Sequence, residues 1–211
     1  GRRRSGDSAC RGGLTATPLL RHSAVVVALF SLWAGRAVAQ ESVEQQAQRF
    51  FDKGLEAAAS GDYPSAIFAF EQSYALLPLP ATLKNLAIYQ DQAGRAAAAY
   101  ASWSELLSRW GETISSATRE EARQRVADLE AIVASVTISA NVPGATVYAD
   151  GRELGAAPLS QPVRLDAGSH VFEARLAGYR DARETALLRE GASTPVQLLL
   201  TPIDVPLPET L

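Results

Sequence analysis

Residues 141–158 read NVPGATVYADGRELGAAP, and this stretch decides how the second half of the chain folds. Asp150-Gly151 lies between the short segments 146–149 and 152–154, which is the strongest local signal for a two-residue β-hairpin turn with positive φ angles. Gly155 is expected to end the returning strand. A phosphate-binding loop would need such glycines between a strand and a helix, with Lys and Ser or Thr following, and no such sequence follows Gly155. The glycines therefore indicate chain reversals in a β-sheet.

Similar turns recur through the rest of the chain. After Gly155, glycines separate short alternating or β-branched segments at intervals of about 10 to 13 residues, as in small β-sandwiches. The motifs are Val142-Pro143-Gly144-Ala145, Val147-Tyr148-Ala149-Asp150-Gly151, Gly155, Pro158-Leu159, Gly168-Ser169-His170, Gly178-Tyr179 and Gly191. Over residues 135–201 this series resembles the PEGA domain, although the namesake motif lacks its glutamate between Pro143 and Gly144. The resemblance implies a small antiparallel β-sandwich without enzymatic activity, a type often found in extracytoplasmic proteins and in fusions with tetratricopeptide repeats.

The preceding segment, from Gln40 to about Val133, is predicted to be helical. Apolar residues recur there at spacings of three and four, alanines are frequent and prolines are few. Three features of the first half return 33 residues later: Gly61, Ala66 and Phe70 correspond to Gly94, Ala99 and Trp103. A period of this length is typical of stacked helical hairpins.

Residues 44–110 resemble two tetratricopeptide repeats. In each unit a small residue, Gly54 or Ala87, would let the second helix approach closely, and an aromatic residue would fill the space between units. Because two units rarely suffice alone, residues 113–133 are expected to form a capping helix. The predicted fold class is α+β in separate domains: about five helices over residues 42–133 in tetratricopeptide-like hairpins, and a PEGA-like antiparallel β-sandwich over residues 135–201. Residues 202–211 are expected to form a flexible tail.

The first 39 residues have the pattern of a secretory signal peptide. Five arginines precede an apolar run over residues 24–34, and Arg36-Ala37-Val38-Ala39 suits cleavage before Gln40. The run is too short to cross a hydrocarbon core of about 30 Å, although an uncleaved anchor at the inner membrane is the alternative. We therefore expect an exported bacterial protein, periplasmic or secreted, without a transmembrane span after cleavage. The remaining residues would carry 14 basic and 22 acidic side chains, a balance that disfavours nucleic acid as a partner.

No catalytic or metal-binding constellation is recognisable after residue 39. Cys10 lies before the apolar run, so the mature chain would contain no cysteine and one histidine, His170. Catalytic dyads, triads and multi-histidine metal sites need more of these residues. No carboxylate pair is singled out by its spacing, and His170 is expected at the rim of the sandwich core, on the same face as Phe172. The sequence predicts no enzymatic activity, no metal and no cofactor.

Two surfaces are candidate binding sites. The repeat resemblance implies that the first helix of each hairpin presents side chains to a peptide, at Gln48, Phe51, Leu55, Lys84, Asn85 and Ile88. The alternative for Lys84 and Asn85 is that they are solvated polar residues. In the β-sandwich, Tyr148, Tyr179 and Arg180 would either contact a glycan or cover the edge of the core.

These observations favour a non-enzymatic scaffold or adaptor of the cell envelope, which binds a protein or peptide partner through its helical repeats. The alternative is a module that binds cell-wall or surface polysaccharide through the β-sandwich.

Overall fold

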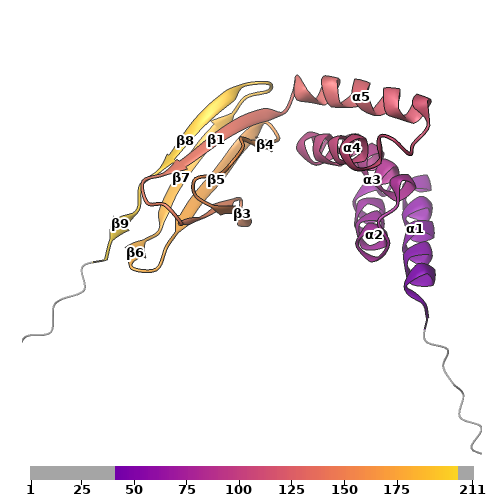
Figure 1. Ribbon diagram of the computed structural model, residues 1–211, viewed down its shortest axis with the longest axis horizontal. Helices are drawn as coiled ribbons and strands as arrows, with labels where there is room; N and C mark the ends of the chain where they lie inside the picture. The colour runs from indigo at the N-terminus through magenta and orange to yellow at the C-terminus, as the bar shows by residue number, and fades with distance from the viewer. Residues whose placement is uncertain (1–40, 204–211) are drawn as a thin grey trace, which may run out of the picture. The chain divides into compact units, whose positions relative to one another are not determined.

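The computed structural model describes residues 41–203, which form a helical part and then a β part (Figure 1). The helical part contains α1 (Val43–Ala59), α2 (Tyr63–Leu76), α3 (Pro80–Gln92), α4 (Ala96–Trp110) and α5 (Ser116–Glu130). The β part begins with β1 at Ala134. This is the expected layout of helices followed by strands. The predicted signal peptide at residues 1–39, with Cys10, lies outside the described residues, and so do residues 204–211.

Helices α1, α2 and α5 begin where the local sequence offers a side-chain cap. The Ser42 hydroxyl accepts a hydrogen bond from the backbone N–H of Gln45, whose side chain accepts one from the N–H of Ser42, so that α1 starts with a capping box. The Asp62 carboxylate accepts from the N–H of Ser65 at 3.2 Å and caps α2. α3 starts differently, because Leu79 provides no side-chain cap and Pro80 supplies a preset φ at the first helical position.

The hairpins α1–α2 and α3–α4 turn in the same way. Gly61 and Gly94 have φ angles of 80° and 73°, in the left-handed region that glycine adopts at the lowest cost. Each hairpin then closes with a hydrogen bond from the next residue to the end of the first helix, from Asp62 N–H to Ala57 and from Arg95 N–H to Gln90. This equivalence, at the spacing seen in the sequence, is compatible with helical repeats.

α1 and α2 approach each other closely at Gly54. A Cβ atom built there would lie 2.7 Å from Cε1 of Phe70, closer than real Cβ contacts. The fully buried Phe70 ring lies between the rings of Phe51 and Tyr89, with centroid distances of 5.5 Å and 5.6 Å. Phe70 therefore joins α1, α2 and α3. The expectation that a small residue on the first helix and an aromatic on the second set this packing is confirmed.

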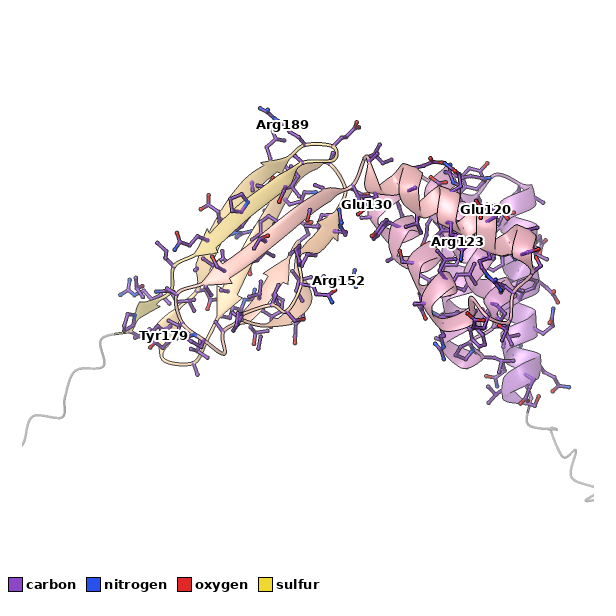
Figure 2. All side chains as sticks on the ribbon, turned by 45° about the horizontal axis from the view of Figure 1, so that its top comes forward. Glu120, Arg123, Glu130, Arg152, Tyr179 and Arg189 are labelled. Carbon is purple, nitrogen blue, oxygen red and sulfur yellow. The ribbon has the colours of Figure 1, made fainter. Side chains whose placement is uncertain are left out.

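The second hairpin packs through the corresponding residues and is covered by α5. Ala87, Ala99 and Trp103 are all buried, in the same apolar cluster as Ala122 and Leu129 of α5. The opposite face of α5 is charged and exposed; Glu120 and Arg123 project from it (Figure 2). α5 therefore has the amphipathic character expected of a capping helix.

The β part contains two main sheets. Its strands are β1 (Ala134–Ala140), β2 (Thr146–Ala149), β3 (Arg152–Ala156), β4 (Val163–Leu165), β5 (Gly168–Arg175), β6 (Tyr179–Arg180), β7 (Ala182–Leu188), β8 (Ser193–Leu198) and β9 (Thr201–Pro202). The sheets have the orders β4-β1-β8 and β3-β2-β5-β7, and β6 pairs with β9. The strand pairs are antiparallel, as expected, except that β1 and β8 run parallel.

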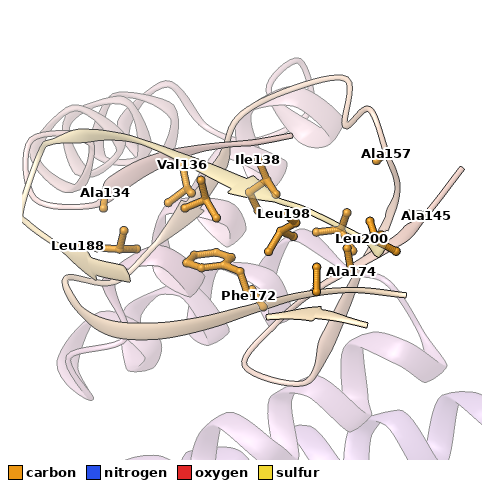
Figure 3. Packing of buried hydrophobic residues seen from close by; sticks show 14 residues of the cluster. Ala134, Val136, Ile138, Ala145, Ala157, Phe172, Ala174, Leu188, Leu198 and Leu200 are labelled. Atoms are coloured by element: carbon orange, nitrogen blue, oxygen red, sulfur yellow. The ribbon is translucent and has the colours of Figure 1, made fainter. Parts of the chain in front are cut away.

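The core of the β part lies between the two main sheets (Figure 3). Val136 and Leu198 contribute from one sheet, and Phe172 and Ala174 from the other, and all four are buried. Burial alternates along β2, where Val147 points inward. The arrangement is therefore a small sandwich with one shared core.

The hairpin of the opening stretch turns as predicted but contains an irregularity. Asp150 and Gly151 have φ angles of 51° and 80°, as the expected tight turn requires. Gly155 lies within β3 rather than at its end. Its φ of 124° accompanies a register shift in which Val147 pairs with Gly155 while Tyr148 pairs with Glu153. Gly155 thus permits a β-bulge, because few other residues adopt this conformation.

The β part extends slightly beyond its expected end. Pro202, the expected first residue of the tail, belongs to β9 and pairs with Tyr179. The N–H of Ile203 donates to the carbonyl of Gly178 at 2.9 Å. Short-range sequence patterns do not reveal this pairing, because β6 and β9 are only two residues long.

Gly54→Ala is expected to lower the free energy of unfolding by about 1 kcal/mol. Alanine favours a helix over glycine by about 1 kcal/mol, but overpacking against a buried ring costs about 1–3 kcal/mol. Chemical denaturation followed by circular dichroism measures the net effect. In a Phe70→Leu background the same substitution should be neutral or stabilising, since the obstructing ring is gone. Stabilisation of the otherwise unchanged chain by Gly54→Ala would contradict the packing argument.

Candidate functional site

A hollow of about 170 Å³ opens on the helical part between α1 and the start of α3. We call it the α1–α3 hollow. Its lining residues come from α1, from the end of α2 and from the start of α3: Glu44, Ala47, Gln48, Phe51, Ser73, Leu77, Leu79, Ala81 and Thr82. Most of its wall is apolar, and Leu79 is 44% exposed. An exposed leucine in a concave apolar wall is a feature of binding surfaces.

Three of the predicted partner-binding residues share one face of α1. Gln48 and Phe51 line the α1–α3 hollow, and Leu55, one helical turn beyond Phe51, is 42% exposed. The position of Phe51 is fixed by its edge-to-face contact with Phe70. The Gln48 side chain donates to the carboxylate of Asp52 at 2.8 Å. Three of the six predicted partner-binding residues thus lie on one face of α1.

The structure places Lys84 and Asn85 outside this hollow. The Lys84 ammonium donates to the carboxylate of Glu121 on α5 at 2.6 Å. The Asn85 amide donates to the carbonyl of Ala81 in its own helix at 2.9 Å. Both polar groups are therefore engaged within the fold. Lys84 therefore links α3 to the capping helix and is not simply a solvated side chain.

Ile88 lies at a second hollow, between α3 and α5, with a volume of about 330 Å³. We call it the α3–α5 hollow. It is lined by Ile88, Asp91, Gln92, Trp103, Glu121 and Arg125. The guanidinium of Arg125 contacts Asp91 across the helices and Asp128 within α5. The guanidinium of Arg125 is thus paired with carboxylates, as is the ammonium of Lys84.

Sequence reasoning missed the wall that follows α2. Leu77, Leu79, Ala81 and Thr82 line the α1–α3 hollow, but the sequence motifs predict no binding role for the surrounding Leu-Pro-Leu-Pro segment. The sequence does contain a signal for this wall. Two leucines lie in a connection interrupted by prolines, where no helical face exists to bury both.

The predicted glycan-contact residues lie in different strands of the β part. Tyr148 is in β2, and the Arg175 guanidinium lies over its ring, 4.7 Å from the centroid. Arg175 is held by Glu173 at 2.5 Å. Tyr179, which is labelled in Figure 2, and Arg180 form β6. Tyr179 packs partly against the sandwich core, whereas Arg180 is exposed. The core-covering alternative thus describes Tyr179, and a cation already occupies a face of Tyr148.

His170 supports the Asp150-Gly151 turn. Its Nδ1 lies 2.6 Å from Oδ2 of Asp150, and its Nε2 lies 2.9 Å from the carbonyl oxygen of Asp166. The ring is near that of Phe172, with 6.5 Å between centroids, and the side chain is 14% exposed. The expected position at the rim of the core is confirmed. One ring nitrogen thus contacts the turn, and the other contacts the connection between β4 and β5.

Asp150 is correspondingly held as a carboxylate. Burial favours its neutral form, but hydrogen bonds from the N–H of Val171, at 2.9 Å, and from His170 outweigh burial and lower the pKa of Asp150. The carboxylate thus acts as a structural acceptor that ties the hairpin to β5.

Within residues 41–203, no group of three or more His, Cys, Asp or Glu side chains is arranged to hold a metal ion. In the same part of the chain, no helix is both long enough and apolar enough to cross a membrane.

Asp150→Asn is expected to flatten the acid dependence of stability. A carboxylate with a lowered native pKa contributes stability above its unfolded pKa of about 3.9, and the contribution is lost as pH falls through the native pKa. The side chain is 49% exposed, so the contribution is about 1 kcal/mol at most. Denaturation between about pH 5 and about pH 2 measures the slope. Asparagine tolerates positive φ, and Glu153→Gln on the same hairpin is the control. Equal slopes for Asp150→Asn and the unsubstituted chain would contradict the assignment.

Comparison with known proteins identifies the β part. The PEGA-domain family matches residues 133–204. No tetratricopeptide-repeat family was matched in the helical part, whose five helices are compatible with repeats. A search of curated proteins found no match. The PEGA domain suggests a surface or binding module. A PEGA domain is thus found at residues 133–204, following five helices.

Proposed function

We propose that the chain is a non-enzymatic adaptor of the bacterial cell envelope, which binds a protein or peptide partner through the helical part. The observation that carries the proposal is the α1–α3 hollow, where Phe51, Leu77 and Leu79 form an apolar wall open to solvent. At about 170 Å³ it is smaller than typical small-molecule pockets of about 300–1,000 Å³. A volume of this size suits one or two side chains of a peptide.

The equivalent hairpins support an interpretation as two tetratricopeptide-like repeats with a cap. Gly61 and Gly94 make equivalent turns, and Ala66 and Ala99 are both fully buried at equivalent positions. In such an arrangement α1, α3 and α5 are the helices that face a partner. Both hollows involve these helices, which is why we assign the binding function to the helical part.

Export and the lack of catalysis are proposed from the sequence. The pattern of residues 1–39 favours export to the periplasm or beyond, with an uncleaved inner-membrane anchor as the alternative. Beyond residue 39 the only histidine is His170, whose ring nitrogens contact Asp150 in the hairpin and the carbonyl of Asp166 before β5. These features favour binding over turnover.

Site-specific photo-crosslinking in the native envelope tests the proposed binding face. A photoreactive residue at Gln48 or Ala81, both at the α1–α3 hollow, is expected to capture a discrete partner. The matched control is Glu71, which is exposed on α2 on the side away from Ser73. Leu79→Ser should reduce capture, because it removes apolar wall while serine supplies an N-cap to α3. Equal capture from Gln48 and Glu71 would refute the assignment of the face.

A second candidate function is binding of cell-wall or surface polysaccharide by the PEGA domain, in which the helices only orient it. The family match and the pair formed by the half-buried Tyr148 and the exposed Arg175 favour it. The full chain should then sediment with purified peptidoglycan, and Tyr148→Ala should weaken this association while Leu79→Ser leaves it unchanged. Failure of the chain to associate with any purified envelope glycan would remove this candidate.

A further inference from the structure

The inner face of the helical part carries an excess of negative charge. We define the inner face as the two hollows and the charged side chains that contact their lining. It includes five carboxylates and two cations: Glu44, Asp52, Asp91, Glu121 and Asp128, with Lys84 and Arg125. Within this set, carboxylates outnumber cations, which favours a cationic over an anionic ligand.

Neither cation is left to attract an anionic partner. Lys84 is bound to Glu121 at 2.6 Å, and Arg125 lies between Asp91 and Asp128. Replacing these contacts with contacts to an incoming anion would leave carboxylates without their partners. The inner face consequently disfavours acidic ligands.

The unpaired carboxylates lie beside the apolar hollow. Among residues 41–203, neither Glu44 nor Asp52 forms an ion pair with a basic side chain. Glu44 lines the hollow, and Asp52 is bonded to the lining residue Gln48. Hydrogen bonds from the backbone N–H of Glu44 and from the Ser42 hydroxyl lower the pKa of Glu44, which keeps it charged. One rim of the α1–α3 hollow is thus acidic.

The other sides of the hollow are apolar. Phe51, Leu77 and Leu79 form the wall, and the exposed Leu55 continues the apolar strip along α1. A complementary segment would place a large apolar side chain against this wall and a positive charge beside Glu44 or Asp52. A helix with apolar residues at spacings of three and four, and basic residues beside them, has this distribution.

We propose that the partner segment bound at the α1–α3 hollow is a basic amphipathic peptide, with a leucine- or phenylalanine-sized side chain in the hollow and Lys or Arg beside Glu44 and Asp52. This assignment rests on the proposed function of peptide binding by the helical part and specifies its ligand class. It is independent of what the PEGA domain binds.

Three labelled peptides of equal length test the ligand class. They share the same Leu and Phe positions at helical spacing and carry Lys, Ser or Glu at the intervening positions. Fluorescence anisotropy with the full chain measures their affinities. We expect the Lys peptide to bind about tenfold more tightly than the Ser peptide, and the Glu peptide to bind most weakly. The difference in affinity between the Lys and Ser peptides should shrink between about 0.1 M and about 1 M salt, because the Debye length falls from about 10 Å to about 3 Å.

Matched variants test the site. Glu44→Lys combined with Asp52→Lys should weaken Lys-peptide binding about tenfold or more and strengthen Glu-peptide binding, because the rim changes sign. Leu79→Ser should weaken both the Lys and the Ser peptides. The controls are Glu71→Lys and Phe68→Ser on exposed positions of α2, which should leave affinities within about twofold. Circular dichroism confirms that each variant is folded.

The outcomes separate this inference from the proposed function. If the three peptides bind equally and Leu79→Ser weakens all of them, peptide binding at the hollow stands but the basic ligand class is refuted. If Lys-peptide binding is insensitive to the rim and wall variants, the assignment of the site is refuted. If no peptide binds, the inference also fails, while crosslinking from Gln48 and Ala81 decides the proposed function separately.

Discussion

The close approach of α1 to α2 at Gly54 determines where the candidate site lies. The absence of a side chain there lets the ring of Phe70 fill the space against α1, and Phe70 in turn contacts Phe51 and Tyr89. These contacts fix α1, α2 and α3 around one buried ring. They thereby also fix the position of Phe51 beside the start of α3. A larger residue at position 54 would clash with the Phe70 ring and so disturb the ring contact that positions Phe51. The apolar wall is therefore a product of core packing as much as of surface composition.

The parts of the fold that sequence reasoning predicted correctly depend on short-range signals. The equivalence of Gly61 with Gly94 follows from the need for a left-handed turn residue, and Asp150-Gly151 specifies its hairpin for the same reason. The parallel pairing of β1 with β8 joins strands far apart in the chain, and no local pattern encodes which edge β8 joins. The bulge at Gly155 was also missed, because a glycine near a strand end is consistent with either a bulge or a terminus.

The candidate site was predicted in part, for a related reason. Helical periodicity places Gln48, Phe51 and Leu55 on one face, on which Gln48 and Leu55 are exposed and Phe51 is half-buried. The repeat resemblance also assigned Lys84 to the corresponding face of α3, but it could not show that Glu121, on a helix much later in the chain, would bind its ammonium. Leu77 and Leu79 were missed because the segment that carries them has no regular period, and its role emerges only when α1 lies beside it.

The capping helix α5 packs on the second hairpin and also determines which charges remain available on the inner face. Lys84 and Arg125 would be the cations of this face, and both are engaged in contacts between or along α3 and α5. Individually, half-exposed ion pairs stabilise a fold by about 1 kcal/mol or less, so their main consequence is electrostatic rather than energetic. Binding these cations in place leaves Glu44 and Asp52 as the charges available beside the apolar wall. A helix that completes the core thereby also determines which ligands the neighbouring hollow can attract.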